Sequence, residues 1–144
     1  MAATVLIVDA ANVVGSRPDG WWRDRVGAAE RLLTALADHA APSGRAALAG
    51  GPADGPDEVV VVLEGQARGA RDECGPGLTV VRAERDGDGC IVEQVRERAG
   101  QGVLVVTSDR ELRCRVAAEG AQVQGAGWLL RQLEAGGPAV GSDG

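Results

Sequence analysis

The stretch Thr4-Val-Leu-Ile-Val-Asp9 is a short run of branched apolar residues that ends at a carboxylate. An apolar run without polar alternation is typical of a strand buried on both faces, as in a parallel sheet. Three later runs have the same character, namely Glu58–Leu63, Leu78–Arg82 and Val103–Val106, and residues 121–124 are a fifth candidate. We therefore expect a mainly parallel sheet of four or five strands.

Segments with apolar residues at helical spacing alternate with these strands. They are Arg23–Ala40, Gly89–Ala99, Arg110–Glu119 and Trp128–Glu134. Ser108 and Glu111 have the spacing of a capping box for the third of these helices. Alternating strands and helices predict a three-layer α/β/α fold, with helices on both faces of the sheet.

The length of 144 residues suits one domain. We assign it to residues 1–135, with a loop over 41–56 and a disordered tail over 136–144. Neither a signal peptide nor a run of ~20 apolar residues is present, and the three cysteines lack metal-ligand spacing, so we expect a cytoplasmic protein with free thiols and no membrane partner.

The charged residues exclude several classes of mechanism. All 15 basic residues are arginine, so a Walker-type phosphate loop and Schiff-base chemistry, which both need a lysine, are excluded. The net charge of −6 argues against tight, non-specific DNA binding, which needs a basic surface.

Carboxylates follow four of the predicted strands. They are Asp9, Glu64, the group Glu84, Asp86 and Asp88, and Asp109. Because the carboxyl ends of parallel strands lie at one edge of a sheet, where open α/β folds bind ligands, we expect these side chains to gather there. Taken singly, each has another explanation: Asp88 and Asp109 could cap helices, Asp86 could belong to a turn, and Glu64 could be a solvated loop residue.

Carboxylates crowded at one edge repel one another, and a divalent cation relieves that repulsion. An all-oxygen ligand set suits Mg²⁺ or Mn²⁺, whereas zinc is disfavoured because the chain has one histidine, His39, late in a helix. Ions of this kind polarise phosphoryl groups and activate water.

Four blocks of the sequence together resemble a known family. They are Val8-Asp9-Ala-Ala-Asn12-Val13-Val14, Val62-Leu63-Glu64-Gly65, Asp86-Gly-Asp88-Gly-Cys-Ile91 and Val105-Val-Thr107-Ser108-Asp109. In order and spacing they resemble the NYN branch of the PIN-like nucleases, close to the YacP-like proteins, over residues 4–133. Glu64 stands where aspartate is commoner in that family.

The resemblance implies a PIN-like fold and a metal-dependent ribonuclease. Asp9, Asp88 and Asp109 would be the metal ligands and, with Asn12, the catalytic residues; Asn12 would orient the first carboxylate or a water molecule. Glu64 and Asp86 would be further ligands. Thr107 and Ser108 would help to hold the site and its substrate.

Arginines near the predicted edge are candidates for binding substrate phosphates. Arg17 follows the first strand, and Arg68 and Arg71 follow the second. Guanidinium groups bind phosphates through paired hydrogen bonds, although arginines in these positions are also compatible with solvated loops.

The leading hypothesis is a metal-dependent phosphodiester hydrolase that cleaves RNA. One alternative is a hydrolase of nucleotides or other small phosphate esters. Another is an RNA- or protein-binding module that keeps the fold without turnover. An oligomer is compatible with the sequence, but no feature indicates one.

Overall fold

The structure is a computed structural model of the 144-residue chain. It describes residues 5–16, 20, 23–40, 58–70, 78–84 and 86–135. The loop expected over 41–56 and the tail expected over 136–144 lie outside the described residues.

The centre of the fold is a five-stranded sheet in the order β3-β2-β1-β4-β5. Its strands are β1 (Val5–Asp9), β2 (Glu58–Leu63), β3 (Leu78–Arg82), β4 (Val103–Val106) and β5 (Gln122–Gln124). Every neighbouring pair is parallel, which confirms the sheet predicted from the apolar runs.

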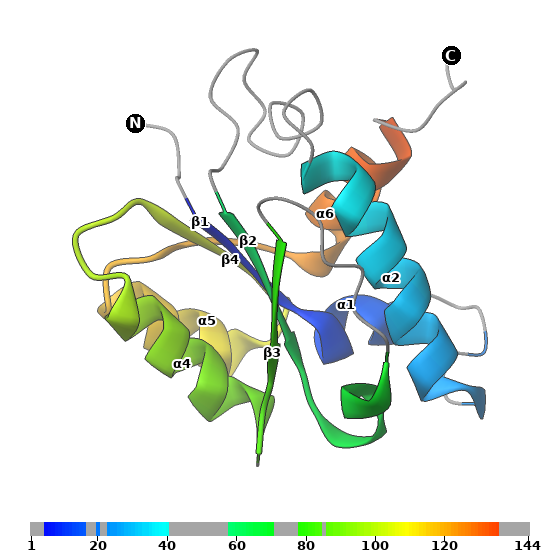
Figure 1. The fold of residues 1–144 in the computed structure, drawn as a ribbon. Helices are drawn as coiled ribbons and strands as arrows, with labels where there is room; N and C mark the ends of the chain where they lie inside the picture. Colours follow the sequence, from blue (N-terminus) through cyan, green and yellow to red (C-terminus); the bar gives the residue numbers. More distant parts are fainter. Residues whose placement is uncertain are drawn as a thin grey trace.

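Helices cover both faces of this sheet (Figure 1). One face carries α1 (Ala10–Gly15), α2 (Arg25–Ala40) and α6 (Ala126–Ala135). The other carries α4 (Gly87–Glu97) and α5 (Arg110–Ala118), and a short 3₁₀ helix, η2 (Gly65–Gly69), follows β2. The three-layer α/β/α architecture is therefore confirmed.

Strand residues alternate between two aliphatic cores. Leu6 and Val8 of β1 pack into the core beneath α1, α2 and α6, whereas Val5 and Ile7 pack into the core beneath α4 and α5. All four side chains are at most 1% exposed. A strand buried on both faces needs an unbroken apolar sequence, which explains the pattern of the opening stretch.

Several helix boundaries differ from those predicted. The sequence analysis missed α1, because its six residues are too few to show helical periodicity. Helix α4 begins at Gly87 rather than Gly89, and α6 begins at Ala126 rather than Trp128.

The predicted capping box of Ser108 and Glu111 is wrong. Helix α5 is capped by Asp109, whose carboxylate accepts a hydrogen bond from the backbone N–H of Leu112. The backbone N–H and the hydroxyl of Ser108 form hydrogen bonds with two other segments of the chain instead.

The helices that connect successive strands lie on different faces of the sheet on either side of β1. The connection after β1 passes through α1 and α2 on one face, whereas those after β3 and β4 pass through α4 and α5 on the other. Because β1 and β4 are neighbours, their carboxyl ends form the topological switch point where α/β sheets bind ligands. None of the described helices is long and apolar enough to cross a membrane.

Candidate functional site

Asp9 lies at the switch point, at the last position of β1. Asp9 is 6% exposed, and both oxygens of its carboxylate accept hydrogen bonds. Oδ1 accepts from the backbone N–H of Asn12 at 3.3 Å and thereby caps α1, and Oδ2 accepts from the hydroxyl of Thr107 at 3.0 Å. The side chain is thus held both by the first turn of α1 and by the residue that follows β4.

Thr107 connects two of the predicted ligands. It follows β4 and is fully buried, and its hydroxyl oxygen also accepts a hydrogen bond from the backbone N–H of Asp109 at 3.1 Å. A buried hydroxyl in this position orients Asp9 rather than contacting a substrate. The chain from Asp9 through Thr107 to the backbone of Asp109 fixes the ends of β1 and β4 relative to each other.

Asn12 makes a second connection between the same two strands. Its side-chain oxygen accepts a hydrogen bond from the backbone N–H of Ser108 at 2.7 Å. The Ser108 hydroxyl in turn accepts from the backbone N–H of Ala126 at 2.9 Å, at the start of α6. The Asn12 side chain therefore positions the loop after β4, while the backbone N–H of the same residue holds the Asp9 carboxylate.

Glu64 and Asp86 bring the other half of the sheet edge into the site. The Glu64 carboxylate accepts a hydrogen bond from the backbone N–H of Gly87, and Asp86 caps α4 by accepting from Gly89 at 2.6 Å. A side chain at position 87 would place its Cβ 2.8 Å from Glu64 Oε1. The glycine is therefore what allows Glu64 to approach α4 so closely.

The carboxylates interact electrostatically. Burial raises the pKa of Asp9 to about 6; the hydrogen bonds from Thr107 and Asn12 oppose this rise, and the charges of Asp88 and Glu64 add to it. Burial also raises the pKa of Asp88, and the neighbouring carboxylates, Asp109 first, raise it further. The negative charges of Asp88, Glu64 and Asp109 are thus close enough to act on the pKa values of their neighbours.

These carboxylates do not form a ready chelate. Within the described part of the chain, no three or more His, Cys, Asp or Glu side chains are grouped so that they could hold one metal ion together. Mg²⁺, however, keeps several waters and is commonly held by one or two carboxylates together with substrate phosphates. The described carboxylates therefore offer the oxygen atoms that a hydrated divalent ion would contact, and no described group of them could hold an ion through protein ligands alone.

The predicted phosphate-binding arginines are only partly described. Arg17 and Arg71 lie outside the described residues. The Arg68 guanidinium donates to the backbone carbonyls of Gly65 at 3.2 Å and Ala83 at 3.4 Å, and so connects η2 to the end of β3. Arg115, which no sequence motif indicated, is an exposed residue of α5 whose positive charge acts on Asp88.

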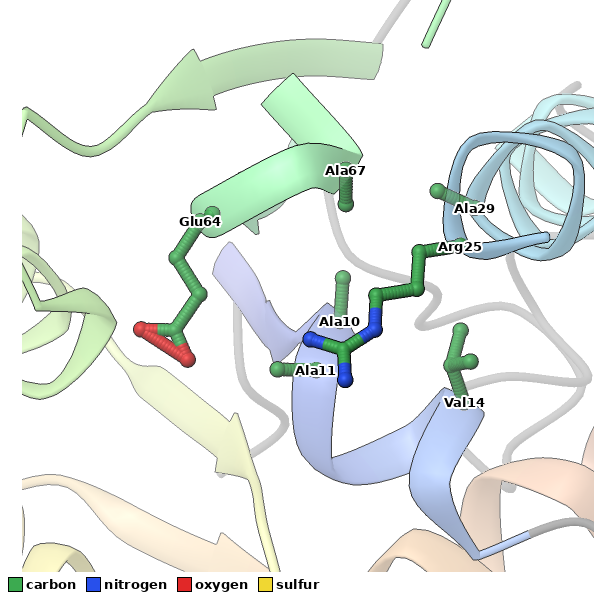
Figure 2. Close-up of a pocket in the computed structure, with 8 residues that line it drawn as sticks. Ala10, Ala11, Val14, Arg25, Ala29, Glu64 and Ala67 are labelled. Carbon is green, nitrogen blue, oxygen red and sulfur yellow. The ribbon is translucent and has the colours of Figure 1, made fainter. Parts of the chain in front are cut away.

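A pocket opens beside the carboxylates, between α1, α2 and η2, with a volume of about 340 Å³. We call it the alanine pocket, because its described walls are mostly small: Ala10, Ala11, Ala29 and Ala67, with Val14 and Gly65. Two charged residues, Arg25 and Glu64, also line it. Figure 2 shows Arg25 reaching from α2 toward Ala10 and Ala11, with Glu64 on the other side of these alanines.

No sequence pattern could have found the alanine pocket or Arg115. The pocket walls come from three separated segments, and small apolar residues there look like any other core positions. Gly87 was visible in the sequence, but its role depends on Glu64, which lies 23 positions earlier.

Comparisons with known proteins agree with the fold. No protein-family model and no curated protein matches the chain. Among solved structures, it is similar to Rae1 (YacP) from Bacillus subtilis, with a TM-score of 0.67, 19% sequence identity, and coverage of 92% of this chain and 74% of that one. A mutant form of the same protein gives a TM-score of 0.68 at 19% identity, covering 92% of this chain and 76% of that one. The chain therefore has a YacP-like fold.

Proposed function

We propose that this chain is a metal-dependent phosphodiester hydrolase that cleaves RNA. The observation that carries the proposal is the state of Asp9. This carboxylate is buried at the topological switch point, its pKa is raised to about 6, and the charged groups that contribute to the shift are other carboxylates. Keeping such a group ionised at neutral pH lowers the stability of the folded chain, and a bound cation would offset that loss.

The side chains of the proposed site have two roles: the carboxylates would face the metal ion, and two polar residues hold the carboxylates and their loop in place. Asp9, Asp88 and Asp109 are the proposed carboxylates for Mg²⁺ or Mn²⁺, of which one or two would contact the ion directly. The remaining carboxylates, with Glu64 and Asp86, would act through water molecules bound to the ion. A divalent cation in this position neutralises phosphoryl oxygens and activates water. Thr107 holds Asp9 in place, and Asn12 holds the loop that carries Asp109.

The fold and the sequence motifs support this proposal together. The four motifs that resemble NYN-type nucleases lie at one edge of a sheet with a YacP-like fold. Rae1 (YacP) is a neighbour in fold at 19% identity, so the substrate of this chain is inferred from its own site and motifs.

Thermal unfolding of the metal-stripped protein tests the metal site. A ligand that binds the native state alone stabilises it by about 2.7 kcal/mol at a hundredfold excess over its Kd. We expect Mg²⁺ or Mn²⁺ to raise the Tm of the wild type and not that of Asp9→Asn. We also expect metal-dependent cleavage of single-stranded RNA that both Asp9→Asn and Asp109→Asn abolish; unchanged metal response and cleavage in these variants would disprove the proposal.

A non-catalytic binding module is the second candidate, and the helix caps favour it. Asp9, Asp86 and Asp109 each accept a hydrogen bond from the start of a helix, which is a sufficient structural reason for three of the acids. This candidate predicts no metal-dependent rise in Tm and no cleavage of any RNA or nucleotide. Comparing single-stranded RNA with nucleoside triphosphates in the same assay separates an RNA substrate from a small phosphate ester.

A further inference from the structure

The position of the alanine pocket connects it to the carboxylates. Ala10 and Ala11 directly follow Asp9 in the chain, and Glu64 belongs both to the pocket and to the acidic edge. A group bound in the pocket therefore lies next to whatever Asp9 acts on. A nucleotide has the corresponding geometry, because its base and its phosphate are joined through one sugar.

The walls of the pocket suit a flat, apolar surface. Four alanines and a glycine line it, and of the described lining residues only Arg25 and Glu64 have long side chains. Its volume of about 340 Å³ is near the lower limit for small-molecule sites, which run from about 300 to 1,000 Å³. A single ring system fits such a space, and a folded peptide segment does not.

Arg25 adds a second kind of contact. Its side chain runs along the pocket toward Ala10 and Ala11 (Figure 2), so its guanidinium plane lies beside the space where a ring would sit. Proteins that recognise single-stranded RNA stack unpaired bases on guanidinium planes and aromatic rings.

The net charge makes a base contact useful. A chain with a formal charge of −6 cannot rely on a broad basic surface to hold RNA. Stacking of a base adds affinity that does not depend on phosphate neutralisation.

We propose that the alanine pocket binds one unstacked nucleobase of a single-stranded RNA, beside the phosphate that the carboxylates act on. This inference rests on the proposed function, since it takes the acidic edge as the place of cleavage. It names the substrate class as unpaired RNA and assigns Ala11, Ala67 and Arg25 to base recognition.

Binding to the metal-free protein tests the pocket without requiring turnover. Fluorescence anisotropy in the presence of a chelator compares a labelled single-stranded RNA oligonucleotide with an abasic oligonucleotide of the same length. We expect the wild type to bind the base-bearing strand about tenfold more tightly, as loss of one stacked base implies.

Two variants fill the pocket from opposite walls. Ala11→Leu adds a side chain at an exposed position of α1, and Ala67→Leu adds one from η2. We expect both variants to bind the base-bearing and the abasic strand with about equal affinity, because the base can no longer stack in the filled pocket. Ala117→Leu is the matched control, an exposed alanine of α5 that does not line the pocket, and it should keep the full preference.

The outcomes separate this inference from the proposed function. Equal binding of both strands by the wild type, or an undiminished preference in Ala11→Leu and Ala67→Leu, overturns the pocket assignment even if metal-dependent cleavage is observed. A base preference that the filled variants lose supports the pocket even if the metal titration fails. If a mononucleotide binds as tightly as the oligonucleotide and is equally sensitive to Ala11→Leu, the base site serves free nucleotides, and the assignment to RNA is wrong.

Discussion

The hydroxyl of Thr107 donates a hydrogen bond of 3.0 Å to Asp9, although the two residues lie 98 positions apart in the sequence. The same hydroxyl accepts from the backbone N–H of Asp109 at 3.1 Å. One buried hydroxyl therefore forms hydrogen bonds both with the Asp9 carboxylate at the end of β1 and with a backbone N–H in the loop that follows β4. The geometry of the site depends on this contact as much as on the acids themselves.

Replacing Thr107 with valine keeps the shape of the side chain and removes the hydroxyl. We expect Thr107→Val to lower the free energy of unfolding by about 1–3 kcal/mol, because it leaves a buried Asp9 oxygen and the Asp109 N–H without their partner. The pKa of Asp9 should rise further, since the Thr107 hydrogen bond lowers it. Urea denaturation and an NMR titration of the Asp9 carboxyl measure the two effects.

The control for this variant is Thr79→Val. Thr79 is exposed and its hydroxyl donates to Glu58 at 2.8 Å, so its replacement removes a hydrogen bond from the surface. We expect a loss of about 0.5–1 kcal/mol. Equal losses from the two variants would show that Thr107 has no special role in the site.

The stability of the metal-free protein should depend on pH through Asp9. The pKa of this group is about 6 in the folded protein and 3.8 ordinarily. Its contribution to stability is therefore fully present below the ordinary value and is lost as the pH rises through 6. At about 1.4 kcal/mol per pH unit, the loss amounts to about 3 kcal/mol.

Asp9→Asn should remove this dependence. The amide oxygen can still cap α1, and the variant carries no charge at neutral pH, so we expect it to be at least as stable as the metal-free wild type at about pH 7. Urea denaturation between about pH 4 and about pH 7, with a chelator present, gives the two profiles. Parallel profiles would contradict the raised pKa.

Gly87→Ala tests the close approach of Glu64 to α4. The added Cβ would lie 2.8 Å from Glu64 Oε1, so the carboxylate must move and lose its hydrogen bond with the Gly87 N–H. We expect a loss of about 1 kcal/mol in stability and a smaller metal-dependent rise in Tm. Thermal unfolding with and without Mn²⁺ measures both.

Gly127→Ala is the matched replacement in α6. Gly127 is exposed, and an added Cβ would lie 3.3 Å from the end of the flexible Arg131 side chain, which can move aside. We expect a gain of about 0.4–1 kcal/mol from the lower entropy of the unfolded chain. A loss of metal response in this variant as well would mean that the effect at Gly87 is not specific to Glu64.

Arg115→Gln tests the cation beside Asp88. The Arg115 charge lowers the Asp88 pKa, so Arg115 lies within electrostatic reach of the acidic edge and can neutralise a bound phosphate there. If it contacts one phosphate, the slope of log affinity for single-stranded RNA against log salt concentration should fall by about 0.7. Arg113→Gln, on the same helix, should leave the slope unchanged, and equal effects of both variants would exclude a defined contact by Arg115.

The sequence predicted the fold closely because the strands are buried on both faces. The predicted strands Glu58–Leu63, Leu78–Arg82 and Val103–Val106 coincide with β2, β3 and β4. Helix ends were harder to predict from the sequence, because the N-cap is whichever polar side chain accepts a hydrogen bond from an N–H group of the first turn. Ser108 had the spacing of a cap, but Asn12 and Ala126 bind it from elsewhere in the chain, and Asp109 caps α5 instead.

The position of the acids along the sheet could be predicted from the sequence, but their geometry could not, and their role in a site stays a prediction. Parallel strands place their following residues at one edge, so the acids could be grouped from topology alone. The contacts that orient them join residues far apart in the sequence, such as Glu64 with Gly87 and Asp9 with Thr107. The spacing of these residues along the chain does not predict that they form hydrogen bonds with one another.

The double use of the aspartates has an evolutionary consequence. If this chain is the proposed hydrolase, selection for folding alone would still preserve Asp9, Asp86 and Asp109 in a descendant that had lost the activity, because each of them caps the start of a helix. Asp88 differs, because it lies in the first turn of α4 without a cap role, and burial, followed by repulsion from its neighbours, raises its pKa. Among homologues of this chain, substitution at position 88 should therefore be the earliest mark of a lineage in which the ancestral chemistry has decayed.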